Sequence, residues 1–205
     1  MNKEKELIDK LIDLAFAEDI GDGDHTTLSC IPATAMGKSK LLIKEAGVLA
    51  GIEVAKEIFN RFDPSMKVEV FINDGTEVKP GDVAMIVEGK VQSLLQTERL
   101  MLNVMQRMSG IATMTRKYAR QLEGTHTRVL DTRKTTPGMR ILEKMAVKIG
   151  GGVNHRIGLF DMILLKDNHV DFAGGIDKAI NRAKDYCKEK GKDLKIDCLL
   201  YTSDA

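Results

Sequence analysis

The stretch Asp161-Met162-Ile163-Leu164-Leu165-Lys166-Asp167-Asn168-His169 decides the fold class of this chain. Its apolar run shows no alternation with polar residues, which is typical of a parallel strand buried on both faces. A helix is predicted next, over residues 175–190, and another strand begins at Leu194-Lys195-Ile196. Because buried strands that alternate with helices form parallel sheets, we expect an α/β fold for this part of the chain.

The segments upstream repeat this pattern. Val129-Leu130 predicts a short strand, and residues 137–149 predict a helix with Pro137 at its start, where the missing N–H costs little. Two polar loops read Asp131-Thr132-Arg133-Lys134-Thr135-Thr136-Pro137-Gly138 and Gly150-Gly151-Gly152-Val153-Asn154-His155-Arg156. Such sheets bind ligands at the carboxyl ends of their strands. We therefore expect five basic side chains to gather at that edge: Arg133, Lys134, His155, Arg156 and Lys166.

The charge distribution indicates the kind of ligand. From Arg128 to His169 there are 8 Lys/Arg and 4 Asp/Glu, a net charge of +4, whereas the whole chain has 31 and 30, a net charge of +1. The remaining residues therefore sum to −3. Because the positive charge is local, it favours a small anionic ligand and argues against a nucleic-acid surface.

The first 90 residues have a different pattern. Apolar residues recur at helical spacing in two segments and alternate strictly with polar residues in Lys67-Val68-Glu69-Val70-Phe71-Ile72. These segments predict a small α+β domain with an antiparallel sheet. The predicted elements are helices over residues 3–17 and 52–62 and strands over residues 38–50, 67–72 and 83–87.

A long helix is predicted from Val91 to about Arg107, with a break at Ser109-Gly110 before a second helix that ends near Leu122. The acidic loop at residues 18–27 superficially resembles a calcium loop, but its glycines are misplaced and no glutamate closes the frame. We expect capping and turn chemistry there instead.

Composition excludes several classes of protein. The 205 residues are 43% hydrophobic and 30% charged, as in soluble globular chains. No run approaches the roughly 18–20 apolar residues of a membrane span, and residues 1–6 lack the apolar region of a signal peptide. Cys30, Cys187 and Cys198 are widely spaced and form no CxxC pair. They predict neither a disulfide framework nor a zinc site, and a reducing cytoplasm is the expected compartment.

The ordered set of motifs resembles the quinolinate phosphoribosyltransferase family, also called nicotinate-nucleotide pyrophosphorylase (carboxylating). The loops quoted above and Lys166-Asp167-Asn168-His169 carry the resemblance, with support from Glu18-Asp19-Ile20-Gly21 and Gln96-Thr97-Glu98-Arg99. It covers residues 5–197. The resemblance implies an N-terminal α+β sandwich domain with a linker helix over residues 1–110. A C-terminal α/β barrel, of which residues 111–205 are the first part, would follow.

The resemblance also implies a reaction. A phosphoribosyl group passes from phosphoribosyl pyrophosphate to quinolinate with decarboxylation, giving nicotinate mononucleotide, pyrophosphate and carbon dioxide on the route to NAD, with Mg²⁺ as cofactor. Arg133, His155 and Arg156 would hold the quinolinate carboxylates. Lys134 and Lys166 would lie close by as catalytic residues, facing quinolinate and the phosphoribosyl donor.

The chemistry suits these residue types. Quinolinate and its co-substrate are both anionic, so they repel one another in a site of reduced dielectric unless cations intervene. The pyridine nitrogen already has its lone pair, so the first step needs alignment and charge stabilisation but no general base. Nicotinate lacks the 2-carboxylate and would leave a cation unpaired, which predicts a large preference for quinolinate.

Arg99, on the long helix, would reach into the neighbouring subunit's site, which makes a homodimer the working unit. Two alternatives stay open beside this interpretation. One is a related phosphoribosyltransferase that uses another aromatic acid. The other is a non-catalytic fragment that only dimerises or binds anions.

The family pattern stops near Asp197. A closed barrel takes about 200 residues or more, and residues 111–205 supply about three β/α units of roughly 30 residues each. We therefore expect a truncated barrel, with the family's acidic metal ligands beyond this chain and no metal ligand predicted within it. Residues 198–205 are expected to be a non-native tail, and the chain is expected to be inactive alone.

Overall fold

A three-stranded antiparallel sheet organises the N-terminal part of the chain. The structure is a computed structural model that describes residues 3–199. The strands β1 (Met36–Leu42), β5 (Val83–Lys90) and β3 (Lys67–Val70) pair in the order β1-β5-β3. A register shift interrupts β1 between Leu41 and Leu42. The predicted antiparallel sheet is confirmed, with β5 as the buried central strand.

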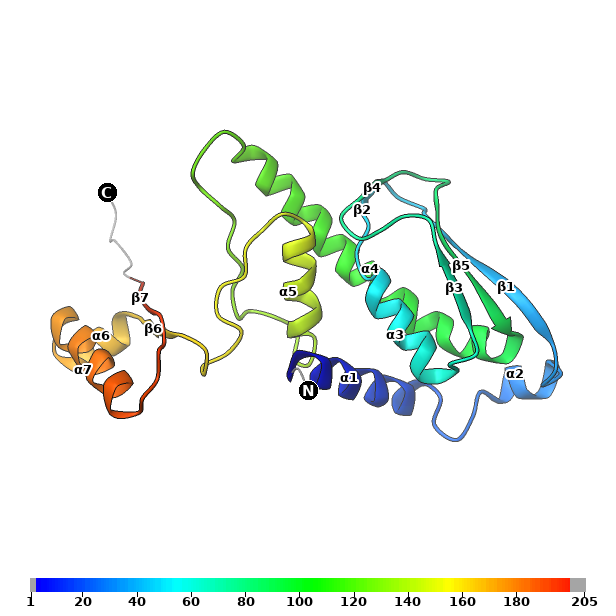
Figure 1. The fold of residues 1–205 in the computed structure, drawn as a ribbon, viewed down its shortest axis with the longest axis horizontal. Coiled ribbons are helices and arrows are strands. Elements are labelled where there is room, and N and C mark those ends of the chain that lie inside the picture. The colour runs from blue at the N-terminus through cyan, green and yellow to red at the C-terminus, as the bar shows by residue number, and fades with distance from the viewer. Residues whose placement is uncertain (1–2, 200–205) are drawn as a thin grey trace. The chain divides into compact units, whose positions relative to one another are not determined.

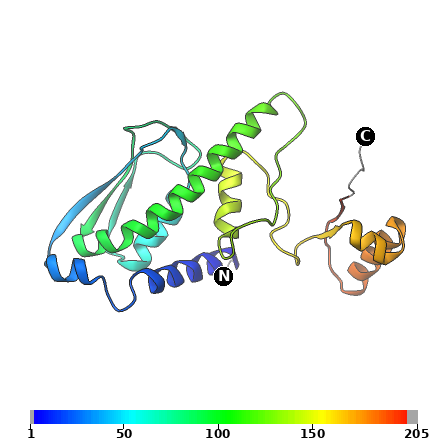
Figure 2. The same cartoon turned by 180° about the vertical axis from the view of Figure 1, so that it is seen from behind.

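Two helices pack side by side against this sheet (Figures 1 and 2). Helix α3 (Ile52–Phe62) has the predicted bounds, because Ile52, Ala55, Ile58 and Phe59 recur on one face and are almost fully buried. Its partner α4 (Val91–Gln121) is 31 residues long. A two-stranded ribbon, β2 (Gly47–Val48) with β4 (Glu77–Val78), completes this part.

The predicted break at Ser109-Gly110 is wrong, because α4 continues through both residues. The Ser109 hydroxyl donates to the Ala50 carbonyl at 3.2 Å and accepts from the Ala50 N–H at 3.0 Å. One turn later, Thr113 Oγ1 accepts from the Val48 N–H at 2.8 Å. These tertiary bonds offset the helix cost of one glycine, which is about 1 kcal/mol.

The N-terminal segment consists of α1 (Lys3–Asp19) and the short α2 (His25–Cys30). The predicted helix over residues 3–17 is confirmed. The acidic loop does what turn chemistry predicts, since Asp24 Oδ1 accepts from the Thr27 N–H at 3.1 Å and caps α2. No helix within residues 3–199 is long and apolar enough to cross a membrane.

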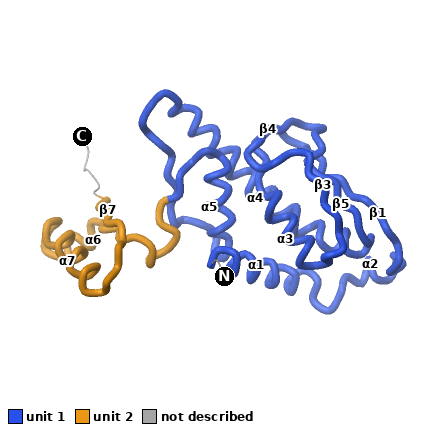
Figure 3. Tube along the Cα trace, viewed as in Figure 1, with its two compact units in different colours: residues 1–154 blue, residues 155–205 orange. Residues whose placement is uncertain are grey.

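The strand predicted at Val129-Leu130 is present only as a single parallel bridge between Leu130 and Val153. The following helix, α5 (Arg140–Ile149), begins three residues later than Pro137, which lies in the preceding turn. Its apolar face packs against α4. The chain divides into two compact units, residues 1–154 and 155–205 (Figure 3).

The second unit contains the predicted parallel pair. Strands β6 (Ile163–Leu165) and β7 (Ile196–Cys198) are parallel, with Ile163 opposite Ile196. Helices α6 (Asp167–Ala173) and α7 (Ile176–Glu189) connect them, and α6 was not predicted.

Part of the predicted non-native tail is described. Cys198 ends β7, and the Leu199 N–H donates to the Leu165 carbonyl at 2.8 Å. Residues 200–205 lie outside the described residues.

Candidate active site

The loop over residues 132–138 presents two predicted site residues. Its first turn is held by Thr132 Oγ1, which accepts from the Lys134 N–H at 3.1 Å, and by the Thr135 N–H, which donates to the Arg133 carbonyl at 2.9 Å. Lys134 is exposed, whereas Arg133 is half-buried. The Arg133 Nε is fully buried and has no hydrogen-bond partner among the described residues. A planar guanidinium with an unused donor is suited to a carboxylate.

The same loop is anchored by residues that sequence reasoning missed. Arg107, on α4, donates to Glu143 Oε1 through Nε at 3.0 Å and Nη2 at 2.6 Å, and Nη2 also donates to Thr136 Oγ1 at 2.8 Å. Glu143, on α5, is 7% exposed and its Oε2 accepts from the Thr136 N–H at 3.3 Å. The side chain of Arg140 donates to Thr135 Oγ1 at 3.0 Å. The loop therefore has a fixed base on α4 and α5.

A second missed feature is the buried pair of Lys144, on α5, and Asp131. The sequence does indicate a buried charge here, because Lys144 lies three residues after Ile141 and therefore on the apolar face of α5. A charged residue on such a face requires a partner. Asp131, just before the loop, was the available carboxylate.

In the second unit, His155 and Asp197 are brought together from positions 42 residues apart. His155 Nε2 donates to Asp197 Oδ2 at 3.1 Å, and Lys195 Nζ lies 3.2 Å from Asp197 Oδ1. The bond from His155 holds the pKa of the Asp197 carboxyl below its usual value, while burial opposes this shift and Lys195 adds to it. This contact with Asp197, absent from the predicted site, fixes which imidazole nitrogen points to β7.

Arg156 and Lys166 differ in their environment. Arg156 is 8% exposed, one of only two buried Lys or Arg side chains among residues 3–199. Lys166 is exposed, directly after β6, and its backbone N–H donates to His169 Nδ1 at 3.0 Å. His169 thus closes the first turn of α6. The Asp161 carboxylate accepts two backbone N–H bonds in the turn that follows Arg156.

The predicted residues therefore fall into three groups. Arg133 and Lys134 share one loop of the first unit, and His155, Arg156 and Lys166 belong to the second. Arg99 is exposed on α4. The gathering of all five basic residues at one edge stays a prediction.

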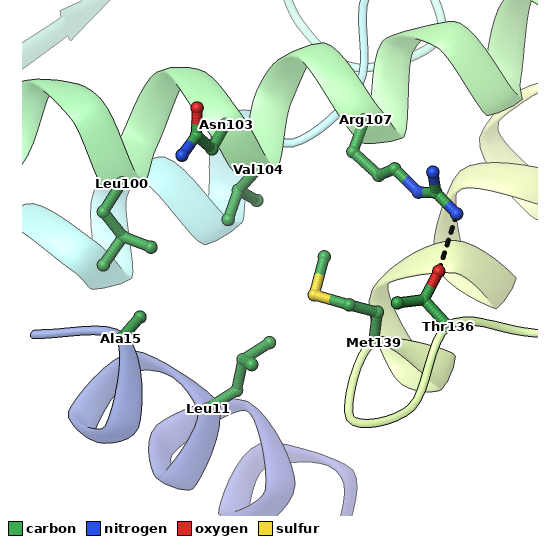
Figure 4. A pocket seen from close by; sticks show the side chains of 8 residues that line it. All are labelled: Leu11, Ala15, Leu100, Asn103, Val104, Arg107, Thr136 and Met139. Carbon is green, nitrogen blue, oxygen red and sulfur yellow. Dashed lines mark hydrogen bonds between the residues drawn. The ribbon is translucent and has the colours of Figure 1, made fainter. Parts of the chain in front are cut away.

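A cleft of about 300 Å³ lies between α1, α4 and the turn before α5 (Figure 4). Leu11, Leu100, Val104 and Met139 make it mainly apolar, and Arg107 and Thr136 supply a polar end. It was not predicted. Its lining lacks the residues expected to bind the substrates, so we assign it no part in the chemistry.

The described residues do not form a magnesium site by themselves. Within residues 3–199, no group of three or more His, Cys, Asp or Glu side chains is placed to hold a metal ion. Asp197 is bonded to His155 and Lys195, and Asp131 is paired with Lys144. Mg²⁺ is commonly held by one or two carboxylates and substrate phosphates, so no metal step is assigned to these residues.

Comparison with protein families matches nearly the whole chain. Residues 24–109 match the family model described as quinolinate phosphoribosyl transferase, N-terminal domain, and residues 111–203 match that of the C-terminal domain. The solved structure of NadC from Streptococcus pyogenes is 40% identical with a TM-score of 0.86, over 92% of this chain and 67% of that one. The chain belongs to the quinolinate phosphoribosyltransferase family.

Other members are similarly close. Nicotinate-nucleotide pyrophosphorylase from Francisella tularensis has a TM-score of 0.84 at 36% identity, over 93% of this chain and 67% of that one. Quinolinate phosphoribosyltransferase [decarboxylating] 1b of Nicotiana tabacum is 46% identical over 189 residues, 91% of this chain and 53% of its own length. The chain spans about half the length of the curated relatives it matches.

A chloroplastic nicotinate-nucleotide pyrophosphorylase [carboxylating] of Oryza sativa is 49% identical over 172 residues, 83% of this chain and 46% of its own length. These quinolinate phosphoribosyltransferase relatives confirm the predicted fold class, an N-terminal domain followed by part of an α/β barrel.

Proposed function

We propose that this chain is part of an enzyme that joins quinolinate to phosphoribosyl pyrophosphate. The products are nicotinate mononucleotide, pyrophosphate and carbon dioxide. Support comes from membership of the quinolinate phosphoribosyltransferase family and from the unpartnered, buried Nε of Arg133. A buried donor without an acceptor is costly, and the carboxylate of an anionic substrate would satisfy it.

The roles we propose follow from the chemistry of each side chain. Arg133, His155 and Arg156 hold the two adjacent carboxylates of quinolinate, the arginines through their planar forks. Each charge-assisted bond contributes roughly 1.5–3 kcal/mol net. Lys134 and Lys166 are exposed cations that balance the charge of quinolinate and of the leaving pyrophosphate.

The bonds change in a fixed order in this proposal. The pyridine nitrogen donates its lone pair to C1 of the ribose as the bond to the pyrophosphate oxygen breaks. When the 2-carboxylate then leaves as carbon dioxide, its electron pair stays on ring C2, where the adjacent pyridinium nitrogen stabilises it, and C2 takes up a proton from water to give the product. No residue of the chain needs to remove a proton, so positioning and electrostatic stabilisation are the expected contributions of the protein.

Three further proposals concern the surroundings of the site. Mg²⁺ enters with phosphoribosyl pyrophosphate, because substrate phosphates commonly supply its ligands. The enzyme is a homodimer in which Arg99, exposed on α4, completes the neighbouring site. The location is the cytoplasm, for which the exposed free thiol of Cys30 is the support.

The test is calorimetric titration of the 205-residue chain with quinolinate and with nicotinate. Quinolinate is expected to bind at least about tenfold more tightly, since one unmade charge-assisted bond is worth roughly 1.5 kcal/mol or more. Equal affinity would favour a relative that uses another aromatic acid. Quinolinate binding without pyrophosphate release on addition of Mg²⁺ and phosphoribosyl pyrophosphate would favour the anion-binding fragment.

A further inference from the structure

A buried ion pair lies behind the loop that carries Arg133 and Lys134. Lys144 is 1% exposed, and its ammonium pairs with the carboxylate of Asp131. The side chain of Asp131 is itself only 7% exposed. Both charges have therefore left water, which is favourable only if the geometry is good and further hydrogen bonds are made.

Asn154 supplies such bonds. Its side-chain amide, oriented with the nitrogen toward two oxygen atoms, donates to Asp131 Oδ2 and to the Lys144 carbonyl, each at 2.9 Å. The three residues come from three places in the chain. Asp131 ends the segment before one loop, Lys144 lies in the middle of α5, and Asn154 ends the segment after α5.

The backbones of the two outer segments are joined at the same point. The Val153 N–H donates to the Val129 carbonyl at 2.8 Å, and the Asp131 N–H donates to the Val153 carbonyl at 3.2 Å. This pairing is only one parallel bridge long. So short a ladder does not fix its own register. The Lys144 ammonium joins the Asp131 segment to α5, and the Asn154 amide joins the second segment to the Lys144 carbonyl and to Asp131.

Each segment leads directly into residues of the proposed site. Arg133 follows Asp131 by two residues, and His155 follows Asn154 immediately. We propose that Lys144, Asp131 and Asn154 form a positioning network that sets the register of these two loops for quinolinate binding. The choice of quinolinate as the ligand rests on the proposed function, whereas the alignment of the two loops by this network does not.

Stability alone does not account for this network. A buried ion pair replaced by apolar residues of similar volume is often as stable as the original, whereas loss of one partner leaves an uncompensated charge. α5 already buries Ile141, Leu142 and Ala146, so an apolar residue at position 144 would continue its apolar face. A charged residue there is explained if it specifies one alignment of the two segments.

The experiment compares three variants of the 205-residue chain. The double substitution Lys144→Met/Asp131→Leu removes both charges and keeps the volume, so the fold is expected to survive. Asn154→Ala removes only the two hydrogen bonds of the side-chain amide. It provides the test if the double variant does not fold. Lys38→Gln/Glu88→Gln, which removes an exposed pair between β1 and β5, is the matched control.

Two readouts are made on each variant. Amide hydrogen exchange is expected to quicken on the order of tenfold at residues 133–136 and 155–157 in the first two variants and to stay unchanged in β5. The dissociation constant for quinolinate is expected to rise on the order of tenfold, because a misplaced binding group loses affinity steeply. The control is expected to change neither quantity.

The outcomes separate this inference from the proposed function. Unchanged exchange in both loops of a folded variant overturns the positioning network, whatever the chain binds. If amide exchange in the two loops is faster in the variants but the unsubstituted chain does not bind quinolinate, the network is supported and the proposed substrate is not. A higher dissociation constant for quinolinate with unchanged exchange would also overturn the positioning network, since the effect would not pass through loop position.

Discussion

His155 Nε2 donates a hydrogen bond to Asp197 Oδ2 across 3.1 Å and thereby joins the start of the second unit to its last strand, β7. Because Lys195 approaches the same carboxylate, Asp197 has two basic neighbours. A residue proposed to hold a substrate carboxylate is thus already oriented by a protein carboxylate. Such support narrows the positions that the imidazole adopts before substrate arrives.

The Asp197 carboxyl is predicted to titrate below 3.8, its ordinary value, because His155 stabilises the ionised form. Because the pKa is lowered on folding, the ionised carboxylate stabilises the folded chain at pH values above its ordinary pKa. That stabilisation is lost as the pH falls through the lower pKa of the folded chain. Carbon-13 NMR titration of the carboxyl measures this directly. His155→Ala should raise the midpoint, and His169→Ala, which removes an imidazole bonded elsewhere, should not. A midpoint at or above 3.8 in the unsubstituted chain contradicts the prediction.

Asp74 caps α3 from a distance, because its Oδ1 accepts from the N–H groups of Gly51 at 2.8 Å and Ile52 at 2.9 Å. Burial raises the pKa of this carboxyl, and the two backbone bonds oppose the shift. Asp74→Ala is expected to lower the free energy of unfolding by about 1 kcal/mol, as loss of an N-cap does. Denaturant unfolding at pH 7 provides the measurement.

Asp74→Asn is the informative companion, since an amide oxygen can accept the same two bonds without charge. Because the pKa is raised on folding, ionisation of Asp74 favours the unfolded chain. This loss of stability is fully present above the pKa of the folded chain and absent below the pKa of the unfolded chain. Asn should therefore match or exceed Asp in stability at pH 7, and its advantage should vanish below about pH 3.9. If Asn destabilises as much as Ala does, the carboxylate charge itself is needed and this account fails.

Gly150, packed against α4, and Gly110, exposed on α4, make a matched pair for substitution by alanine. A Cβ at Gly150 would lie 2.5 Å from the Ala112 carbonyl oxygen and 2.7 Å from Thr115 Cβ. Gly150→Ala is expected to cost about 2–3 kcal/mol through overpacking against α4. Gly110→Ala meets nothing within 4 Å and should stabilise the helix by about 0.5–1 kcal/mol. Equal effects of the two substitutions, in thermal or urea unfolding, would contradict the close approach.

Arg107 and Glu143 are predicted to be energetically coupled. Arg107→Ala leaves the Glu143 carboxylate, which is 7% exposed, without its cation. The substitution should lower the free energy of unfolding by about 2 kcal/mol. A double-mutant cycle with Glu143→Gln measures the coupling, expected between about 0.5 and 3 kcal/mol. The exposed Lys38–Glu88 pair should give less than about 1 kcal/mol. Coupling no larger than in that exposed pair would show that the loop over residues 132–138 is not held from α4.

Periodicity predicted some elements well and others poorly. The bounds of α3 followed from its apolar spacing. The parallel pairing of β6 and β7 followed from the continuous apolar run of β6 and from the alternation of strands with helices. The break in α4 was wrong because local propensity at Ser109-Gly110 is overridden by bonds to the segment at Ala50. Local sequence does not contain that information, since the partner lies 59 residues away.

The sequence by itself determined the alternation of strands and helices, the antiparallel sheet of the first unit and the family, because these depend on local periodicity and on ordered motifs. Tertiary structure alone decided which charged groups are buried and what they contact. Lys144, Glu143 and Arg156 are ionisable side chains in any conformation, but only the packed chain removes their water. That loss of water makes each partner obligatory, and it explains why Asp131, Arg107 and Asn154 matter although no motif marks their contacts.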